Sequence, residues 1–297
     1  MYDAFIVNNS TAYAVGEIYS DSSIEFGYPP SVIAKWDGTA WNSSPLNYRY
    51  QGQSHPIHSL SGISVLGGQF WLAAGGIFTW DGVSSQAPLV FSRLTLQNQN
   101  ATIVKIQALS NVSVYGFGTF GTIVFYNGSA WEILANTSNL NVQDIYGNGG
   151  TVLAVTSYPG ESLDKQILQI NGTTVTQLST NPIQGPLTSA WFVPGHYYVV
   201  GQGIYEKNSL SDSVWKQDSV DTVDFFSCVR GNAWNDFFVA GGYGQLLHYN
   251  GKSWQSYRNV LGMQSGGITS IAVNGNLMIG VGGLGSKAVA FVGRREN

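Results

Sequence analysis

Charged side chains are scarce in this chain of 297 residues. Asp, Glu, Lys and Arg make up 10% of it, whereas an average soluble protein has about 25%. The 13 basic residues form no run and the net charge is −4, so the basic surface that nucleic-acid backbones require is missing. We therefore expect no nucleic-acid partner, and a surface whose polarity comes from Ser, Thr and Asn.

Cysteine and long apolar runs are also missing. The single Cys228 excludes an intrachain disulfide, and its apolar neighbours predict a buried strand position. No segment reaches the roughly 18 apolar residues of a membrane span. The start Met1-Tyr2-Asp3 has neither the basic nor the apolar region of a signal peptide. We expect no direct membrane insertion, and we expect the signal of an exported protein to be absent from this sequence.

The number of N-glycosylation acceptors indicates export. Chance pairing of the Asn and Ser/Thr residues would give roughly four Asn-x-Ser/Thr triplets, and the chain has eight. They start at Asn8, Asn9, Asn42, Asn100, Asn111, Asn127, Asn136 and Asn171. We therefore expect an extracellular or cell-surface location.

Glycine and aromatic residues are abundant, with 37 Gly, 9 Trp, 16 Tyr and 14 Phe. Aromatic and β-branched runs punctuated by Gly are typical of short strands joined by tight turns, which predicts an all-β class. A turn tripeptide recurs with glycines 44, 46, 44 and 79 residues apart, the last gap being close to two periods. Its copies are Trp36-Asp37-Gly38, Trp80-Asp81-Gly82, Tyr126-Asn127-Gly128, Ile170-Asn171-Gly172 and Tyr249-Asn250-Gly251.

A second repeated element is an apolar strand that usually ends in glycine, and it occurs seven times. The copies lie at 12–16, 70–76, 114–118, 152–157, 197–203, 237–242 and 277–283. A period of about 40 to 50 residues with strand-like content predicts a β-propeller. We expect one domain of seven antiparallel four-stranded blades at about 2–44, 57–92, 103–135, 142–180, 186–217, 224–257 and 268–294. The last blade lacks an obvious fourth strand, and Tyr2–Val7 aligns with first strands, so it is not expected to complete that blade.

The Asp-Gly and Asn-Gly steps predict a two-residue type I′ hairpin between the third and fourth strands. A tryptophan then opens the fourth strand, as at Trp41, Trp131 and Trp254, and we expect it to pack between neighbouring blades. The double glycine Gly241-Gly242, followed by Tyr249 and Trp254, resembles kelch and galactose-oxidase-like propellers of the extracellular prokaryotic type. Asp-box propellers are the second choice, because they place one more residue between Asp and Gly.

The candidate site is a pair of long loops, 17–31 and 42–56, which should stand side by side on one face of the ring. They combine tyrosines with charged groups, which suits stacking on sugar rings or on a protein partner. The candidate ligand-binding residues are Tyr19, Glu25, Tyr28, Tyr48, Arg49, Tyr50 and His55. The alternative interpretation is that these loops only shield the blade.

The search for catalytic chemistry is mostly negative. His55 and His58 lack a third ligand for zinc, and calcium and phosphate loops are absent, so we expect no metal and no cofactor. The copper ligands of galactose oxidase cannot be placed here, and the arginines fall at unrelated blade positions, unlike a sialidase trio. Asp144 and Asp224, on first strands, are the carboxylates that could face the channel of a glycosidase.

We therefore expect a secreted or cell-surface propeller that recognises a glycan or a surface protein through the face bearing loops 17–31 and 42–56. The alternative is a glycan-active hydrolase or lyase with carboxylates at the central channel, against which the low charge counts. An intracellular kelch-type scaffold would need a companion domain, for which the chain has no room.

Overall fold

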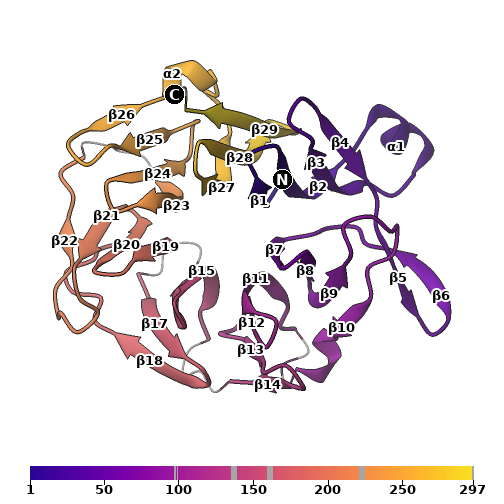
Figure 1. Cartoon of the computed structure of the whole chain (residues 1–297), viewed down its shortest axis with the longest axis horizontal. Helices are drawn as coiled ribbons and strands as arrows, with labels where there is room; N and C mark the ends of the chain where they lie inside the picture. Colours follow the sequence, from indigo (N-terminus) through magenta and orange to yellow (C-terminus); the bar gives the residue numbers. More distant parts are fainter. Residues whose placement is uncertain (97, 99, 135–138, 159–162, 221–224, 296–297) are drawn as a thin grey trace.

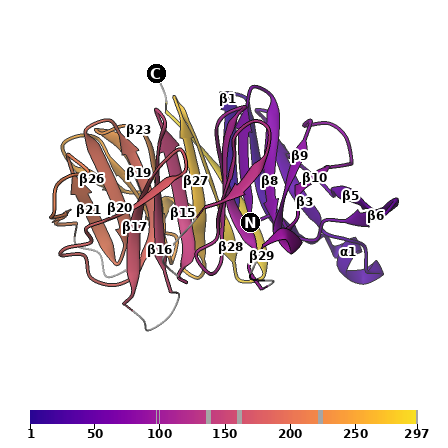
Figure 2. The same ribbon diagram turned by 90° about the horizontal axis from the view of Figure 1, so that it is seen from below.

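The computed structural model describes residues 1–96, 98, 100–134, 139–158, 163–220 and 225–295. Seven antiparallel sheets stand around a common axis like the blades of a propeller (Figures 1 and 2). Six sheets have four strands in chain order, and the seventh has three. This arrangement confirms the predicted all-β, seven-bladed propeller with a three-stranded last blade.

Each blade takes its strands from one continuous stretch of the chain. Blade one holds β1 (Asp3–Asn8), β2 (Thr11–Ile18), β3 (Ser31–Trp36) and β4 (Trp41–Ser44), and blade two holds β7 (Gly62–Leu66), β8 (Gln69–Ala74), β9 (Gly76–Trp80) and β10 (Leu89–Phe91). Blade three holds β11 (Ile103–Ser110), β12 (Ser113–Gly118), β13 (Ile123–Tyr126) and β14 (Trp131–Ile133), and blade four holds β15 (Asn141–Asn148), β16 (Thr151–Ser157), β17 (Lys165–Asn171) and β18 (Thr174–Leu178). Blade five holds β19 (Leu187–Val193), β20 (His196–Gly201), β21 (Gly203–Lys207) and β22 (Lys216–Gln217), and blade six holds β23 (Phe226–Ala233), β24 (Asp236–Gly241), β25 (Leu246–Tyr249) and β26 (Trp254–Ser256). Blade seven holds β27 (Gly267–Asn274), β28 (Leu277–Leu284) and β29 (Lys287–Arg294).

Four small elements lie outside the blades. They are a hairpin of β5 (Asn47–Tyr50) and β6 (Gln53–Pro56), the helices α1 (Asp21–Phe26) and α2 (Arg258–Leu261), and the 3₁₀ turn η1 (Arg93–Thr95). Thus the region predicted as loop 17–31 contains a short helix, and the region predicted as loop 42–56 contains two strands. Within the described ranges, no helix has the length and apolar character needed to cross a membrane.

Side chains on the innermost strands join several neighbouring blades by hydrogen bonds. Asp3 accepts from the backbone of Ile63 in blade two, and Ser189 of blade five accepts from the backbone of Val229 in blade six. The ring closes where Ser270 of blade seven donates to Asp3 of blade one over 2.8 Å. These contacts explain why small polar residues recur on the buried first strands, because an unpaired buried amide would be costly.

The glycine at or near the end of most second strands is required by a close backbone approach. A Cβ atom on Gly118 would lie 1.8 Å from the carbonyl oxygen of Thr102, and one on Gly201 would lie 2.1 Å from that of Pro186. Gly241 and Gly282 face the same kind of carbonyl at 2.2 and 2.0 Å. The repeated Gly therefore marks where the second strand crosses the segment that leads into the first strand of its own blade.

The turn between third and fourth strands differs from the predicted type I′ hairpin. Four residues, Asp37 to Ala40, separate the paired Trp36 and Trp41, and Asp37 does not have the positive φ that a type I′ turn requires. Its carboxylate accepts hydrogen bonds from the backbone of Thr39 and Ala40 instead. Asp and Asn recur there because a short side-chain acceptor organises this turn.

Tryptophans that open the fourth strands pack between blades, as predicted. Trp41 joins the apolar cluster between blades seven and one, and Trp254 joins that between blades five and six. Trp131 contacts Phe91 of blade two with 5.4 Å between ring centroids. Each of these tryptophans also packs against the aromatic residue at the end of its own third strand, and such pairs add to the stability from buried area.

Candidate binding site

The hairpin β5–β6 extends from the ring between blades one and two (Figure 1). Its turn is Gln51-Gly52, whose φ angles of 50° and 80° are both positive, so the type I′ geometry occurs here instead. Alternation along β5 places Tyr48 and Tyr50 on one side of the hairpin and Arg49 on the other. The two tyrosines are therefore presented together.

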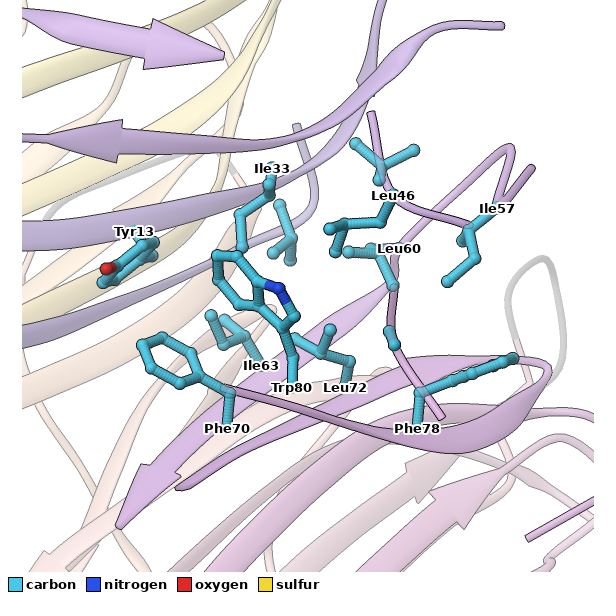
Figure 3. Packing of buried hydrophobic residues seen from close by; sticks show 13 residues of the cluster. Tyr13, Ile33, Leu46, Ile57, Leu60, Ile63, Phe70, Leu72, Phe78 and Trp80 are labelled. Carbon is cyan, nitrogen blue, oxygen red and sulfur yellow. The ribbon is translucent and has the colours of Figure 1, made fainter. Parts of the chain in front are cut away.

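Buried residues on both sides hold the base of this hairpin in place. Leu46 and Ile57, which flank it, belong to the apolar cluster that also contains Leu60 and Phe78 (Figure 3). The backbone of Asn47 also donates to Ser85 and accepts from Ala87, at 2.9 and 2.8 Å. The hairpin is thus a fixed projection, because its base is part of the core between blades one and two.

A hollow of about 580 Å³ lies between this hairpin and blade two. Its apolar wall includes Tyr48, Tyr50, Ile57, Phe78, Leu89 and Leu94. Its polar wall includes His58, Ser59, Ser61, Ser92, Arg93 and Thr102. Apolar walls with a few polar groups are what small ligands and short peptide segments bind.

Three predicted site residues come together on the hairpin. Tyr48 and His55 are cross-strand partners with ring centroids 5.6 Å apart, and Tyr50 lies 6.4 Å from His55. Tyr48 also packs edge-on against Phe78 at 5.4 Å, which fixes its ring. Tyr50 remains 45% exposed, so it is the ring of this cluster that is offered to solvent.

Of the predicted site residues only Tyr48 and Tyr50 line the hollow, and neither His55 nor the other four do. Tyr19 directly follows β2, is 54% exposed and is not among the residues that line the hollow. Glu25 and Tyr28 are exposed on and just after α1. Arg49 is exposed on the far side of the hairpin.

Sequence reasoning missed several residues that line the hollow, above all Phe78, Arg93 and Leu94. Arg93 and Leu94 lie on η1, in the connection from the fourth strand of blade two to blade three. That connection is on the same face of the ring as residues 42–56. It is long, because β10 ends at Phe91 and β11 begins at Ile103, and this length is the sequence signal that could have identified it. His58 was considered only as a metal ligand.

The channel carboxylates are used to hold the ring together. Asp144 is 4% exposed and accepts two hydrogen bonds of 2.9 Å from the guanidinium of Arg230. It also accepts from the hydroxyl of Ser189 and from the backbone of Ala190. Asp3 lies 3.4 Å from the amine of Lys105. Asp224, the other carboxylate considered for catalysis, lies outside the described residues.

The charge state of Asp144 follows from this pairing. Burial alone would raise the pKa of its carboxyl, but the charge and hydrogen bonds of Arg230 outweigh burial and hold the pKa below its usual range. Lys105, Asp144 and Arg230 line both axial cavities, of about 230 and 220 Å³. A general acid needs a raised pKa, so Asp144 does not suit the general-acid role in the hydrolase alternative.

The remaining sequence predictions concern surface and thiol positions. Seven of the eight acceptor asparagines are exposed, and Asn136 lies outside the described residues. Cys228 is buried in β23, as predicted, and burial raises the pKa of its thiol to about 12. Among the described residues there is no group of three or more His, Cys, Asp or Glu side chains that could hold a metal ion.

Comparison with known proteins finds similarity in structure only. No family model and no curated protein matches the chain. A solved structure of YCF48 bound to D1 peptide has a TM-score of 0.72 and 16% identity, over 100% of this chain and 93% of that one. YCF48 from Cyanidioschyzon merolae has a TM-score of 0.67 and 12% identity, over 99% and 94%.

A third solved structure comes from a different group of propellers. The WD40 propeller domain of Doa1 has a TM-score of 0.69 and 13% identity, over 99% of this chain and 93% of that one. Identities this low show the fold alone. They support the seven-bladed propeller and do not distinguish kelch from Asp-box blades.

Proposed function

We propose that this chain is a binding propeller that holds an extended peptide segment of a protein partner in the hollow between hairpin β5–β6 and blade two. The observation that carries the proposal is the rigid hairpin, whose exposed Tyr50 and fixed Tyr48 form one wall of a 580 Å³ hollow. Rigid aromatic residues at the edge of a pocket are typical anchors of protein recognition.

The opposite wall suits a peptide backbone. Arg93 and His58 can approach carbonyl or carboxylate oxygens, and Ser59 has a hydroxyl that can donate and accept. The hydroxyl of Ser61 donates to Ala73 and that of Thr102 shares a hydrogen bond with Thr119, but each oxygen can accept a further hydrogen bond. The apolar floor of Ile57, Phe78 and Leu89 suits one aliphatic or aromatic side chain of the segment. A peptide with such an anchor and polar flanks therefore fits the chemistry of the hollow.

The structural comparisons support this choice of ligand class. A protein of the same fold, YCF48, has been solved with a D1 peptide bound, which shows that this fold can present a peptide-binding surface. The extracellular or cell-surface location is part of our proposal, supported by seven exposed acceptor asparagines. The kelch-like classification of the blades also remains a proposal, supported by the double glycine and the spacing of the aromatic residues.

A glycan is the second candidate ligand, because Tyr50 exposes a ring face on which a sugar could stack. In this alternative, Tyr19 and Tyr28, which are 54% and 63% exposed, could extend the surface beyond the hollow. Binding of a glycan should then depend on tyrosines of both regions. Binding of a peptide in the hollow should depend on the hairpin and not on α1.

The test is a selection from a random peptide library on the purified chain, alongside a glycan array. Each ligand is then titrated against Tyr50→Ala, with Arg49→Ala on the far side of the same hairpin as the matched control and Tyr19→Ala reporting on the α1 region. We expect selected peptides with a shared apolar anchor, about tenfold weaker for Tyr50→Ala and unchanged for the other two variants.

Two results would contradict the proposal. In the first, no peptide sequence is enriched and the chain binds a glycan only when both Tyr50 and Tyr19 are present, which would establish the glycan alternative. The other is enriched peptides whose affinity does not change in Tyr50→Ala, which would place the binding site elsewhere.

A further inference from the structure

The outer edge of blade seven is an open β edge. In the other six blades a fourth strand pairs with the third, whereas in the described residues no strand pairs with the outer side of β29. Leu284 and Lys287 close a two-residue loop, and the backbone of Arg295 donates to Asn276. By the alternation of an antiparallel ladder, Ala290 and Val292 therefore point their backbone N–H and C=O groups to the open side.

The register of the hairpins shows what else blade seven lacks. Val114 pairs with Tyr126 in blade three, and Phe237 pairs with Tyr249 in blade six. Counted from the second-strand glycine that approaches a backbone carbonyl, which is Gly118, Gly241 and Gly282 in blades three, six and seven, the corresponding pair in blade seven is Met278 and Gly293. The aromatic ring that ends the third strand in blades three and six is therefore replaced by glycine in blade seven.

An apolar hollow of about 250 Å³ lies at this position, between blades six and seven. Its wall includes Phe238, Tyr257, Leu261, Met278, Phe291 and Gly293. In blades one, three and six, the tryptophan of the fourth strand packs into the corresponding space beside the preceding blade. A cavity of about 150 Å³ can hold a benzene ring, so this hollow can hold an aromatic side chain.

The charges around the hollow indicate what should flank that side chain. Arg294 lines it and is exposed, and Arg258 is exposed on the adjacent α2. Arg295 also lines it, but its guanidinium already pairs with Asp236, so Arg294 and Arg258 are the charges that a segment would meet. None of the described lining residues is Asp or Glu. A segment with acidic residues beside its aromatic anchor would therefore meet complementary charge.

We propose that β29 accepts a β-strand from a partner protein, an extended segment with an aromatic anchor and acidic flanks that completes blade seven. The backbone of the segment pairs with Ala290 and Val292, as in other cases of strand addition. Its aromatic side chain lies opposite Gly293, as Trp254 lies opposite Tyr249 in blade six. This site is separate from the hollow at hairpin β5–β6, so the two proposals can fail independently.

The chain supplies its own matched probes. A labelled peptide copying residues 127–134 contains Trp131 followed by Glu132, and one copying 250–256 contains Trp254 preceded by Lys252. Titrations by fluorescence anisotropy should show that the acidic peptide binds more tightly than the basic one, by about threefold or more at low salt. The Trp131→Ala version of the first peptide should bind about tenfold more weakly.

Two variants of the chain test the two parts of the site. Gly293→Tyr restores the ring against which the fourth-strand tryptophan packs in blades three and six, and the atom nearest its Cβ would be the flexible end of Met278, at 3.0 Å. Ala290→Pro removes an outward N–H, which edge strands tolerate. The control is Gly283→Tyr at the other end of β28, where a Cβ meets only the Lys287 carbonyl at 3.7 Å.

We expect Ala290→Pro to bind the 127–134 peptide about tenfold more weakly, and Gly293→Tyr to bind it about threefold more tightly because an aromatic pair forms. The control should bind it within about twofold of the unchanged chain. Melting curves show whether each variant is folded, and if one variant does not fold, the other and the Trp131→Ala peptide still decide. Unchanged affinity in the folded variants would overturn the proposal, as would absence of binding to the unchanged chain at about millimolar peptide. A dimer that Ala290→Pro dissociates would show that the edge binds a second copy instead of a partner.

Discussion

Replacing Arg230 by leucine should destabilise the whole ring, because Arg230 is the counter-charge of buried Asp144. The variant leaves a carboxylate that is 4% exposed with the hydroxyl of Ser189 and the amide of Ala190 as its remaining close donors. Removing one partner of a buried ion pair costs about 3–5 kcal/mol of unfolding free energy. For a domain of this size, that corresponds to a fall in melting temperature of about 6–15 °C.

The pH dependence separates a lost charge from lost packing. In the unchanged chain the pKa of Asp144 is lowered, so its stabilising contribution is present above the unfolded pKa of about 3.9 and is lost as pH falls below it. Without Arg230, burial should raise the pKa of Asp144. The penalty of Arg230→Leu should then be largest near pH 7 and should decrease as the pH falls toward 4.

Thermal unfolding followed by circular dichroism at several pH values is the assay, with Asp144→Asn/Arg230→Leu as the matched double variant. The double variant should recover part of the lost stability at pH 7, because it no longer buries a lone charge. A melting temperature of Arg230→Leu within about 2 °C of the unchanged chain, or a deficit that does not vary with pH, would refute this reasoning.

Three further predictions concern the repeat. Asp37→Ala should lower the melting temperature at pH 7, whereas Asp37→Asn should not, because Asn127 makes the same turn contacts in blade three. Backbone hydrogen bonds from Ala40 and Thr39 hold the pKa of Asp37 at about 2. The difference in melting temperature between the unchanged chain and Asp37→Ala should therefore decrease as pH falls from about 4 toward 2. Equal melting of Asp37→Ala and the unchanged chain at pH 7 would contradict this account. Gly118→Ala should cost about 1–3 kcal/mol in urea unfolding, since its Cβ would meet a backbone carbonyl at 1.8 Å; a neutral effect would mean that the backbone there is not constrained. The Cys228 thiol, with a pKa of about 12, should react with a thiol reagent at pH 8 only after unfolding, and rapid labelling of the folded chain would show that it is accessible.

The repeat made the fold predictable, because its two markers correspond to two separate steric requirements. The glycine at the end of the second strand avoids a backbone carbonyl, as Gly201 does, and the aromatic-Asp/Asn-Gly step organises the turn before the fourth strand. The turn type was wrong, because Asp-Gly also occurs in loops where the carboxylate, and not positive φ at both residues, determines the shape.

The site was only partly predictable. Tyr48, Tyr50 and His55 lie within eight residues of one another and reach the same hairpin, so local sequence identified them. Arg93 lies opposite them only because blade two folds against the hairpin, and Arg230 meets Asp144 across 86 residues of sequence. Such contacts depend on ring closure, which local patterns do not specify.

The strongest test of peptide binding at the hairpin is hydrogen–deuterium exchange of the chain with and without a peptide from the library selection. Slower exchange at 47–56 and 92–95, with β29 unaffected, is the result that our account predicts, because these segments line the hollow. Protection confined to the axial cavities around Asp144, or absent from the hairpin at saturating peptide, would contradict the central claim.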